Sequence, residues 1–134
     1  MVVRLLTKSD MPVVAVYGTL RRGGVANHMM RGSTFLGQDK IKGTLYRVGW
    51  FPGLELTDSG EEVVADLYEV SEAQKKALDR YEGYIEGNPG DSLFIRRPIT
   101  TVGGVKAEAY EYSACQIMPD ETIIKSGDWF DEAQ

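Results

Sequence analysis

The 134-residue sequence has few of the residues that build disulfide frameworks and metal centres. It contains one cysteine, Cys115, and one histidine, His28. One cysteine excludes an internal disulfide, and one histidine excludes a metal site made of several imidazoles. The acidic pairs Glu61-Glu62 and Asp131-Glu132 lack the spacing of calcium or zinc ligands. We therefore expect no metal site.

Long apolar runs and basic runs are also missing. No apolar segment approaches the roughly 20 residues of a membrane span, and the N-terminal residues do not have the pattern of a signal peptide. The net charge is −5, and the Arg21-Arg22 pair is too short to neutralise a phosphate backbone. We expect neither a membrane nor a nucleic acid as partner, and a cytoplasmic location.

The motifs of common cofactor sites are absent as well. There is no phosphate-binding loop, no dinucleotide fingerprint and no Gly-x-Ser-x-Gly nucleophile elbow. His28 stands beside two methionines, and Cys115 lies in an apolar context typical of a small buried side chain. Both are interpreted as structural or exposed residues rather than catalytic ones, and no cofactor is expected.

What is present fits one ordinary globular domain spanning residues 1–134, with residues 1–12 as an uncertain lead-in. Hydrophobic residues make up 43% and charged residues 26% of the chain. The run at 13–17 predicts a strand buried on both faces. Further strands are predicted at 35–46, 63–70, 94–102 and 105–113, the last two joined by a Gly103-Gly104 hairpin turn. Residues 49–60 are predicted to be a loop.

The best-defined helix begins after Ser71 and ends at Gly83. Ser71 is a favourable N-cap, and Gln74 completes a capping-box pattern. The expected apolar stripe consists of Ala73, Ala77, Leu78 and Tyr81. Because the strands do not alternate with helices, we predict an α+β fold: a small, mostly antiparallel β-barrel with a few short flanking helices.

Two segments are candidates for chemistry. Glu82 lies at the border of the apolar stripe in the last helical turn, where burial and the helix dipole would raise its pKa into a range useful for proton exchange. Gly18 follows a buried strand, so the turn Tyr17-Gly18-Thr19-Leu20 can offer backbone N–H groups to a carboxylate or oxyanion. The plain alternatives are an exposed glutamate and an ordinary turn.

An ordered series of short motifs carries a resemblance. The series is Val16-Tyr17-Gly18-Thr19-Leu20-Arg21, Asn27-His28, Gly43-Thr44-Leu45-Tyr46, Phe51-Pro52-Gly53, Leu67-Tyr68-Glu69-Val70, Leu78-Asp79-Arg80-Tyr81-Glu82-Gly83-Tyr84, Phe94-Ile95-Arg96 and Ser126-Gly127-Asp128-Trp129. In this order the chain resembles the gamma-glutamylcyclotransferase-like family, particularly its gamma-glutamylamine cyclotransferase branch and related small bacterial members. The resemblance runs from about Val13 to Phe130.

The resemblance implies a small β-barrel whose cavity joins the Tyr-Gly-Thr-Leu turn to a catalytic glutamate. Carried over by position, that glutamate is Glu82. Tyr17, Gly18, Thr19 and Leu20 would hold the glutamyl group, and Tyr112 would also face the cavity. Three features depart from the family pattern: Ala65 replaces a common glycine, Phe94 replaces a frequent tyrosine, and the stretch before Val13 is longer than usual.

The implied reaction needs no metal or cofactor. In a small-molecule gamma-glutamyl substrate, Glu82 would take a proton from the α-ammonium, the amine would attack its own gamma-carbonyl, and 5-oxoproline and a free amine would leave. Two other functions stay open: a non-catalytic module that binds a small carboxylate or amide in the same cavity, and a structural or interaction domain. The leaving amine and the oligomeric state are not predicted.

Overall fold

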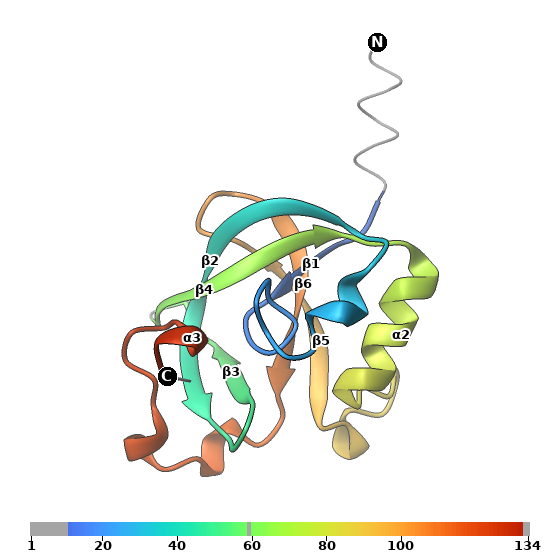
Figure 1. Cartoon of the computed structure of the whole chain (residues 1–134). Helices are drawn as coiled ribbons and strands as arrows, with labels where there is room; N and C mark the ends of the chain where they lie inside the picture. The colour runs from blue at the N-terminus through green and yellow to red at the C-terminus, as the bar shows by residue number, and fades with distance from the viewer. Residues whose placement is uncertain (1–10, 59, 133–134) are drawn as a thin grey trace.

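The computed structural model describes residues 11–58 and 60–132, in which six strands form one curled sheet in the order β3-β2-β4-β1-β6-β5 (Figure 1). The strands are β1 (Val13–Val16), β2 (Thr34–Arg47), β3 (Pro52–Leu56), β4 (Glu61–Glu69), β5 (Phe94–Thr100) and β6 (Lys106–Tyr112). All neighbours are antiparallel except β1 and β6, which run parallel. The expected mostly antiparallel α+β fold is confirmed, in the form of a half-barrel.

Two α-helices flank the sheet: α2 (Glu72–Glu82) lies alongside β5, and α3 (Trp129–Glu132) lies on the other side near β2 and β4 (Figure 1). Single 3-10 turns complete the described chain, namely η1 (Asn27–Met30), η2 (Pro89–Asp91), η3 (Cys115–Ile117) and η4 (Asp120–Thr122). Among these described helices, none is long and apolar enough to cross a membrane.

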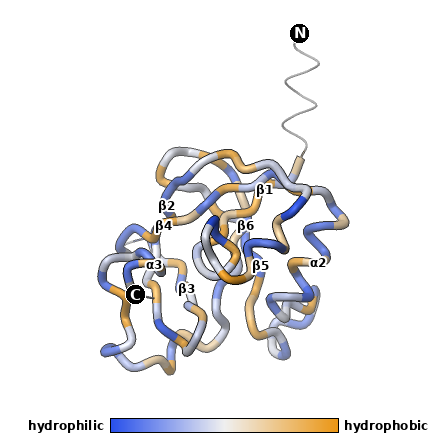
Figure 2. The backbone as a smooth tube through the Cα atoms, in the orientation of Figure 1, coloured by the Kyte–Doolittle hydropathy of each residue, from blue (hydrophilic) through white to orange (hydrophobic). Residues whose placement is uncertain are grey.

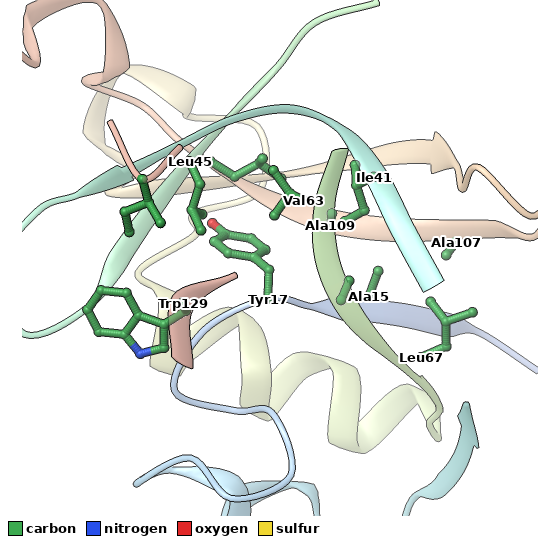
Figure 3. Packing of buried hydrophobic residues seen from close by; sticks show 12 residues of the cluster. Ala15, Tyr17, Ile41, Leu45, Val63, Leu67, Ala107, Ala109 and Trp129 are labelled. Atoms are coloured by element: carbon green, nitrogen blue, oxygen red, sulfur yellow. The ribbon is translucent and has the colours of Figure 1, made fainter. Parts of the chain in front are cut away.

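Strand β1 separates two hydrophobic clusters, because successive side chains of a strand point to opposite faces. Ala15 and Tyr17 pack into the first cluster, where the Tyr17 ring lies near Leu45 and Trp129 (Figure 3). Val14 and Val16 pack into the second, with Leu78 of α2. Figure 2 shows the hydrophobic middle of the sheet against the more hydrophilic α2. The prediction of a strand buried on both faces is confirmed.

Helix α2 begins and ends where the sequence predicts. The Ser71 hydroxyl accepts the Gln74 N–H at 3.1 Å, and Gly83 adopts the left-handed conformation (φ +71°) that ends the helix. Only half of the capping box forms, because the Gln74 side chain donates to the carbonyl of Arg31 instead. The predicted apolar stripe was wrong for Ala73 and Tyr81, which are exposed.

Two strand predictions need correction. Residues 49–60 contain strand β3, which pairs with β2 and begins at Pro52 on the edge of the sheet, where a missing N–H is tolerated. The expected strand at 35–46 is longer, with an irregularity between Phe35 and Gly37. The hairpin of β5 and β6 is confirmed, but its connection is longer than the predicted Gly103-Gly104 turn, because β5 ends at Thr100 and β6 begins at Lys106. Residues 1–10 of the predicted lead-in lie outside the described residues. At the end of the lead-in, the carbonyl of Pro12 accepts the Val70 N–H at 3.0 Å.

Candidate active site

A cavity of about 210 Å³ opens where β1 ends and the last turn of α2 passes over it. Five parts of the chain contribute to its walls. The lining residues are Ala15, Val16, Tyr17, Gly18, Thr19, Leu20, Trp50, Phe51, Pro52, Tyr81, Glu82, Leu93, Phe94 and Tyr110. The fold thus brings Glu82 and the turn after β1 together, although more than 60 residues separate them in the sequence.

The turn after β1 is held in one conformation by its own backbone and by close packing. The Arg21 N–H donates to the Gly18 carbonyl at 3.1 Å, which closes a four-residue turn. A Cβ on Gly18 would lie 2.6 Å from the Pro52 side chain, so only glycine fits there. Within the described chain no hydrogen bond uses the N–H groups of Thr19 and Leu20, which leaves both available to a ligand.

Arg21 fixes the far end of this turn from beneath. Its buried guanidinium pairs with Asp128 at 2.8 Å and with Asp66 at 3.7 Å, and stacks 4.2 Å from the centre of the Phe130 ring. The N–H of Arg22 donates to the same Asp66 carboxylate at 2.9 Å. Charged contacts to β4 and to the C-terminal segment therefore position the turn.

Glu82 is the last residue of α2 and is half-buried. Burial raises the pKa of its carboxyl to about 8, and no cation among the described residues offsets the effect. A carboxyl group with this pKa exchanges protons readily near neutral pH. The Thr19 hydroxyl lies 3.0 Å from the Tyr81 hydroxyl, which links the turn directly to the helix end that carries Glu82.

Two buried tyrosines form the floor of the cavity. The Tyr17 hydroxyl donates to the backbone carbonyl of Tyr110, and the Tyr110 hydroxyl donates to Asp79 at 2.6 Å. Burial raises the pKa of both phenols. Glu82 raises the pKa of Tyr17 further, and Asp79 followed by Glu82 does so for Tyr110. Both rings therefore stay neutral. Asp79 also pairs with Arg96 of β5, so the turn of α2 before Glu82 is tied to the sheet.

Five of the six residues expected at the site line this cavity: Tyr17, Gly18, Thr19, Leu20 and Glu82. Tyr112 is not among the lining residues. It packs behind the wall, with its ring centre 5.3 Å from that of Phe94 and 6.5 Å from that of Phe51. A Cβ on Gly53 would meet the Tyr112 ring at 2.8 Å, so the ring fills the space against β3.

Sequence reasoning assigned no site role to Trp50, Phe51, Pro52, Tyr81 or Leu93, all of which line the cavity. The Phe51-Pro52-Gly53 motif could have indicated that Phe51 and Pro52 belong to the site, but the surrounding segment was interpreted as a loop. As expected, Cys115 is buried and His28 exposed. Burial and neighbouring carboxylates raise the pKa of the Cys115 thiol to about 12. No group of three or more potential metal ligands occurs in the described part of the chain.

The fold and cavity define a class: a small half-barrel in which a half-buried carboxyl group shares a cavity with a backbone turn. A family model described as gamma-glutamyl cyclotransferase, AIG2-like, matches residues 14–131. The chain belongs to this family.

Individual relatives agree with the family match. A gamma-L-glutamyl-butirosin B gamma-glutamyl cyclotransferase from Niallia circulans is 40% identical over 90 residues, which cover 64% of this chain. The chain matches only 55% of that relative's length. An uncharacterized protein from Pyrococcus horikoshii superposes with a TM-score of 0.70 and 28% identity, covering 90% of this chain and 92% of that one.

A mouse AIG2-like protein shares the fold at lower identity. It superposes with a TM-score of 0.65 and 24% identity, covering 81% of this chain and 84% of that one. At this identity the likeness concerns the fold alone.

Proposed function

We propose that this protein is a cyclotransferase that acts on a gamma-glutamyl amine or gamma-glutamyl amino acid and releases 5-oxoproline. The observation that carries the proposal is the meeting of Glu82 with the turn Gly18-Thr19-Leu20 in one cavity. Glu82 supplies a group with a pKa of about 8, and the turn supplies the N–H groups of Thr19 and Leu20, which have no partner among the residues that the structure describes. Family membership and the cyclotransferase named among its relatives support the same reaction.

The reaction follows from these two groups. Ionised Glu82 accepts a proton from the substrate α-ammonium, and the freed amine attacks the gamma-carbonyl carbon of the same molecule. The new C–N bond closes a five-membered ring, and the N–H groups of Thr19 and Leu20 stabilise the oxyanion. The bond to the leaving nitrogen then breaks as Glu82 returns its proton there. Solvent takes the second proton from the ring nitrogen and protonates the amine product.

Mass spectrometry of 5-oxoproline tests this proposal. The wild type, Glu82→Gln and a control, Glu86→Gln at an exposed position outside the cavity, would be incubated with gamma-glutamyl amines, gamma-glutamyl amino acids and gamma-glutamyl-ε-lysine. We expect product from the wild type and the control, and a loss of at least 100-fold in Glu82→Gln. Circular dichroism confirms that each variant is folded.

No product from any substrate with folded wild type would overturn the enzyme reading. Retained binding by Glu82→Gln in that case would favour the non-catalytic binding module instead. We also propose a cytoplasmic location and a small-molecule substrate as the partner.

A further inference from the structure

Residues 22–30 form a loop that is bonded to the turn after β1 but does not line the cavity. We call this segment the backing loop. The Ala26 N–H donates to the Thr19 carbonyl at 2.9 Å. The Asn27 side chain donates to the Leu20 carbonyl at 2.8 Å. The backing loop therefore holds the carbonyl oxygens of the same two residues whose N–H groups are left for a ligand.

The bond from Ala26 sets the direction of the Leu20 N–H. This N–H shares a peptide unit with the Thr19 carbonyl, and in a trans peptide unit the two groups point in opposite directions. Because Ala26 holds the carbonyl, the N–H points away from the backing loop. A Cβ on Gly24 would lie 2.3 Å from the Thr19 carbonyl oxygen, so only glycine fits there without moving this peptide unit.

The bond from Asn27 reaches the Thr19 N–H through two peptide units. The Leu20 carbonyl shares a peptide unit with the Arg21 N–H, which donates to the Gly18 carbonyl at 3.1 Å. The Gly18 carbonyl in turn shares a peptide unit with the Thr19 N–H. Hydrogen bonds in such a row polarise one another, so the last N–H becomes a stronger donor.

The chemistry of the Asn27 side chain suits this role. A carbonyl oxygen can only accept, so the amide nitrogen must be the atom that faces Leu20. The same nitrogen also donates to the Tyr68 hydroxyl at 3.1 Å, which holds the amide in this orientation. No other hydrogen bond reaches the Leu20 carbonyl among the described residues. The sequence motif Asn27-His28 therefore supports the site from behind the cavity wall.

We propose, resting on the proposed function, that Asn27 is a positioning residue for the reaction. By holding the Leu20 carbonyl it fixes the turn and aligns the Thr19 N–H with the developing oxyanion. Since Asn27 does not line the cavity, it acts through the turn alone. The oxyanion exists only once the ring nitrogen has attacked, so the effect falls on the rate of turnover rather than on substrate binding.

Steady-state kinetics of Asn27→Leu tests the proposal, because leucine keeps the approximate shape and removes the donor. The control is Asn88→Leu, at the other asparagine of the chain, which is exposed and outside the cavity. With a gamma-glutamyl amine that the wild type converts, Asn27→Leu should lower kcat about 30-fold and change KM less than about threefold. The control should keep both values. A kcat within about threefold of wild type, or a loss confined to KM, would overturn the proposal.

Thermal unfolding followed by circular dichroism shows whether each variant is folded at the assay temperature. If Asn27→Leu is not, Asn27→Ala removes the same bond with a smaller side chain, and the same expectation applies to it.

A change at Gly24 tests the backing loop independently of Asn27. Gly24→Ala pushes against the Thr19 carbonyl and should turn the Leu20 N–H, which lowers kcat at least about tenfold. The control is Gly90→Ala, because a Cβ there has its nearest neighbour at 3.9 Å. Equal kcat values for these two variants would contradict the positioning of the turn by the backing loop.

Amide hydrogen exchange followed by NMR separates the proposal from the proposed function, because it needs no substrate. Without the Asn27 bond the turn opens more often, so the Arg21 N–H should exchange about tenfold faster in Asn27→Leu than in wild type. The Tyr84 N–H, which donates to the Asp79 carbonyl at the end of α2, should exchange at an unchanged rate. If the wild type forms no 5-oxoproline, the proposed function fails, while faster Arg21 exchange still supports Asn27 as the residue that holds the turn. Unchanged Arg21 exchange would overturn the proposal in either case.

Discussion

Burial of Glu82 disfavours the ionised carboxylate that the proposed reaction needs as a proton acceptor. The carboxyl group sits at the end of a helix against a cavity of mostly apolar walls, and its pKa rises from 4.5 to about 8. In the unfolded chain the same group would ionise near its ordinary pKa. The folded protein therefore holds this proton between about pH 4.5 and 8, whereas the unfolded chain has released it.

The sign of the resulting pH effect follows from proton linkage. Stability from the neutral carboxyl is fully present below about pH 4.5 and is lost as the pH rises through about 8. Glutamine cannot ionise, so Glu82→Gln should gain stability relative to the wild type as the pH rises. We expect the difference to grow by about 4 kcal/mol between pH 5 and pH 9.

Urea unfolding of both proteins across this pH range measures the effect, and Glu86→Gln serves as the control at an exposed position. A difference between Glu82→Gln and wild type that stays constant with pH would contradict the raised pKa.

Glu82 could be predicted from the sequence because the residues that place it lie close to it in the chain. The helix pattern and the glycine stop place this residue on the inner edge of the last turn. The sequence also predicted burial as a cause of the raised pKa of Glu82. The neighbours that create the burial were not, since Phe51 and Leu93 are brought there by other parts of the chain.

Helix α2 is held to the sheet more by polar contacts than by an apolar stripe. Leu78 is its one fully buried side chain. Around it, Lys75 pairs with Glu108 of β6 at 3.0 Å, and Asp79 contacts both Arg96 and Tyr110. These contacts fix the rotation of the helix about its axis, and with it the direction of Glu82.

Asp79→Asn should therefore destabilise the protein. The change removes the negative charge that pairs with Arg96, whose side chain is only 11% exposed, and weakens the bond from the Tyr110 hydroxyl. We expect a loss of about 2 kcal/mol in the free energy of unfolding, measured by urea denaturation. In the control Glu72→Gln the carboxylate that pairs with Lys75 is exposed, and the change should be below about 0.5 kcal/mol. Similar effects of the two variants would refute this reading of α2.

The elements differ in how far the sequence could predict them. Both ends of α2 are set by residues inside the segment, Ser71 and Gly83, so its bounds were predictable. Strand β3 was missed because Pro52 and Gly53 are turn-forming residues by local preference. What makes the segment a strand is pairing with β2 and packing of Gly53 against Tyr112, which are tertiary contacts.

Across the whole molecule, the C-terminal segment returns to support the cavity. Asp128 pairs with Arg21 under the turn after β1, and Trp129 enters the first hydrophobic cluster. The apolar residues Trp129 and Phe130 favour a tail that folds back onto the body. Its charged contact with Arg21 could not be predicted, because 107 residues separate the two side chains.

Asp128→Asn should lower the melting temperature by about 5–10 °C. Of its two carboxylate partners, the buried Arg21 guanidinium would keep only Asp66 at the longer distance of 3.7 Å, which leaves its charge poorly compensated. A loss of about 2 kcal/mol corresponds to that shift in a protein of this size. Differential scanning calorimetry measures it, with Asp131→Asn at an exposed position as the control. A melting temperature equal to that of the control would argue against support of the turn from the C-terminal segment.

The position of β1 in the sheet has a consequence for how the molecule is made. This strand is translated before both of its neighbours, β4 and β6, with which it forms pairs such as Val13 with Glu69 and Val14 with Glu108. One edge of β1 must therefore wait, unpaired, until most of the chain has left the ribosome. Contacts so distant in sequence close slowly. The turn that shapes the cavity is translated before the strands that flank β1, and it is among the last segments to reach its final form.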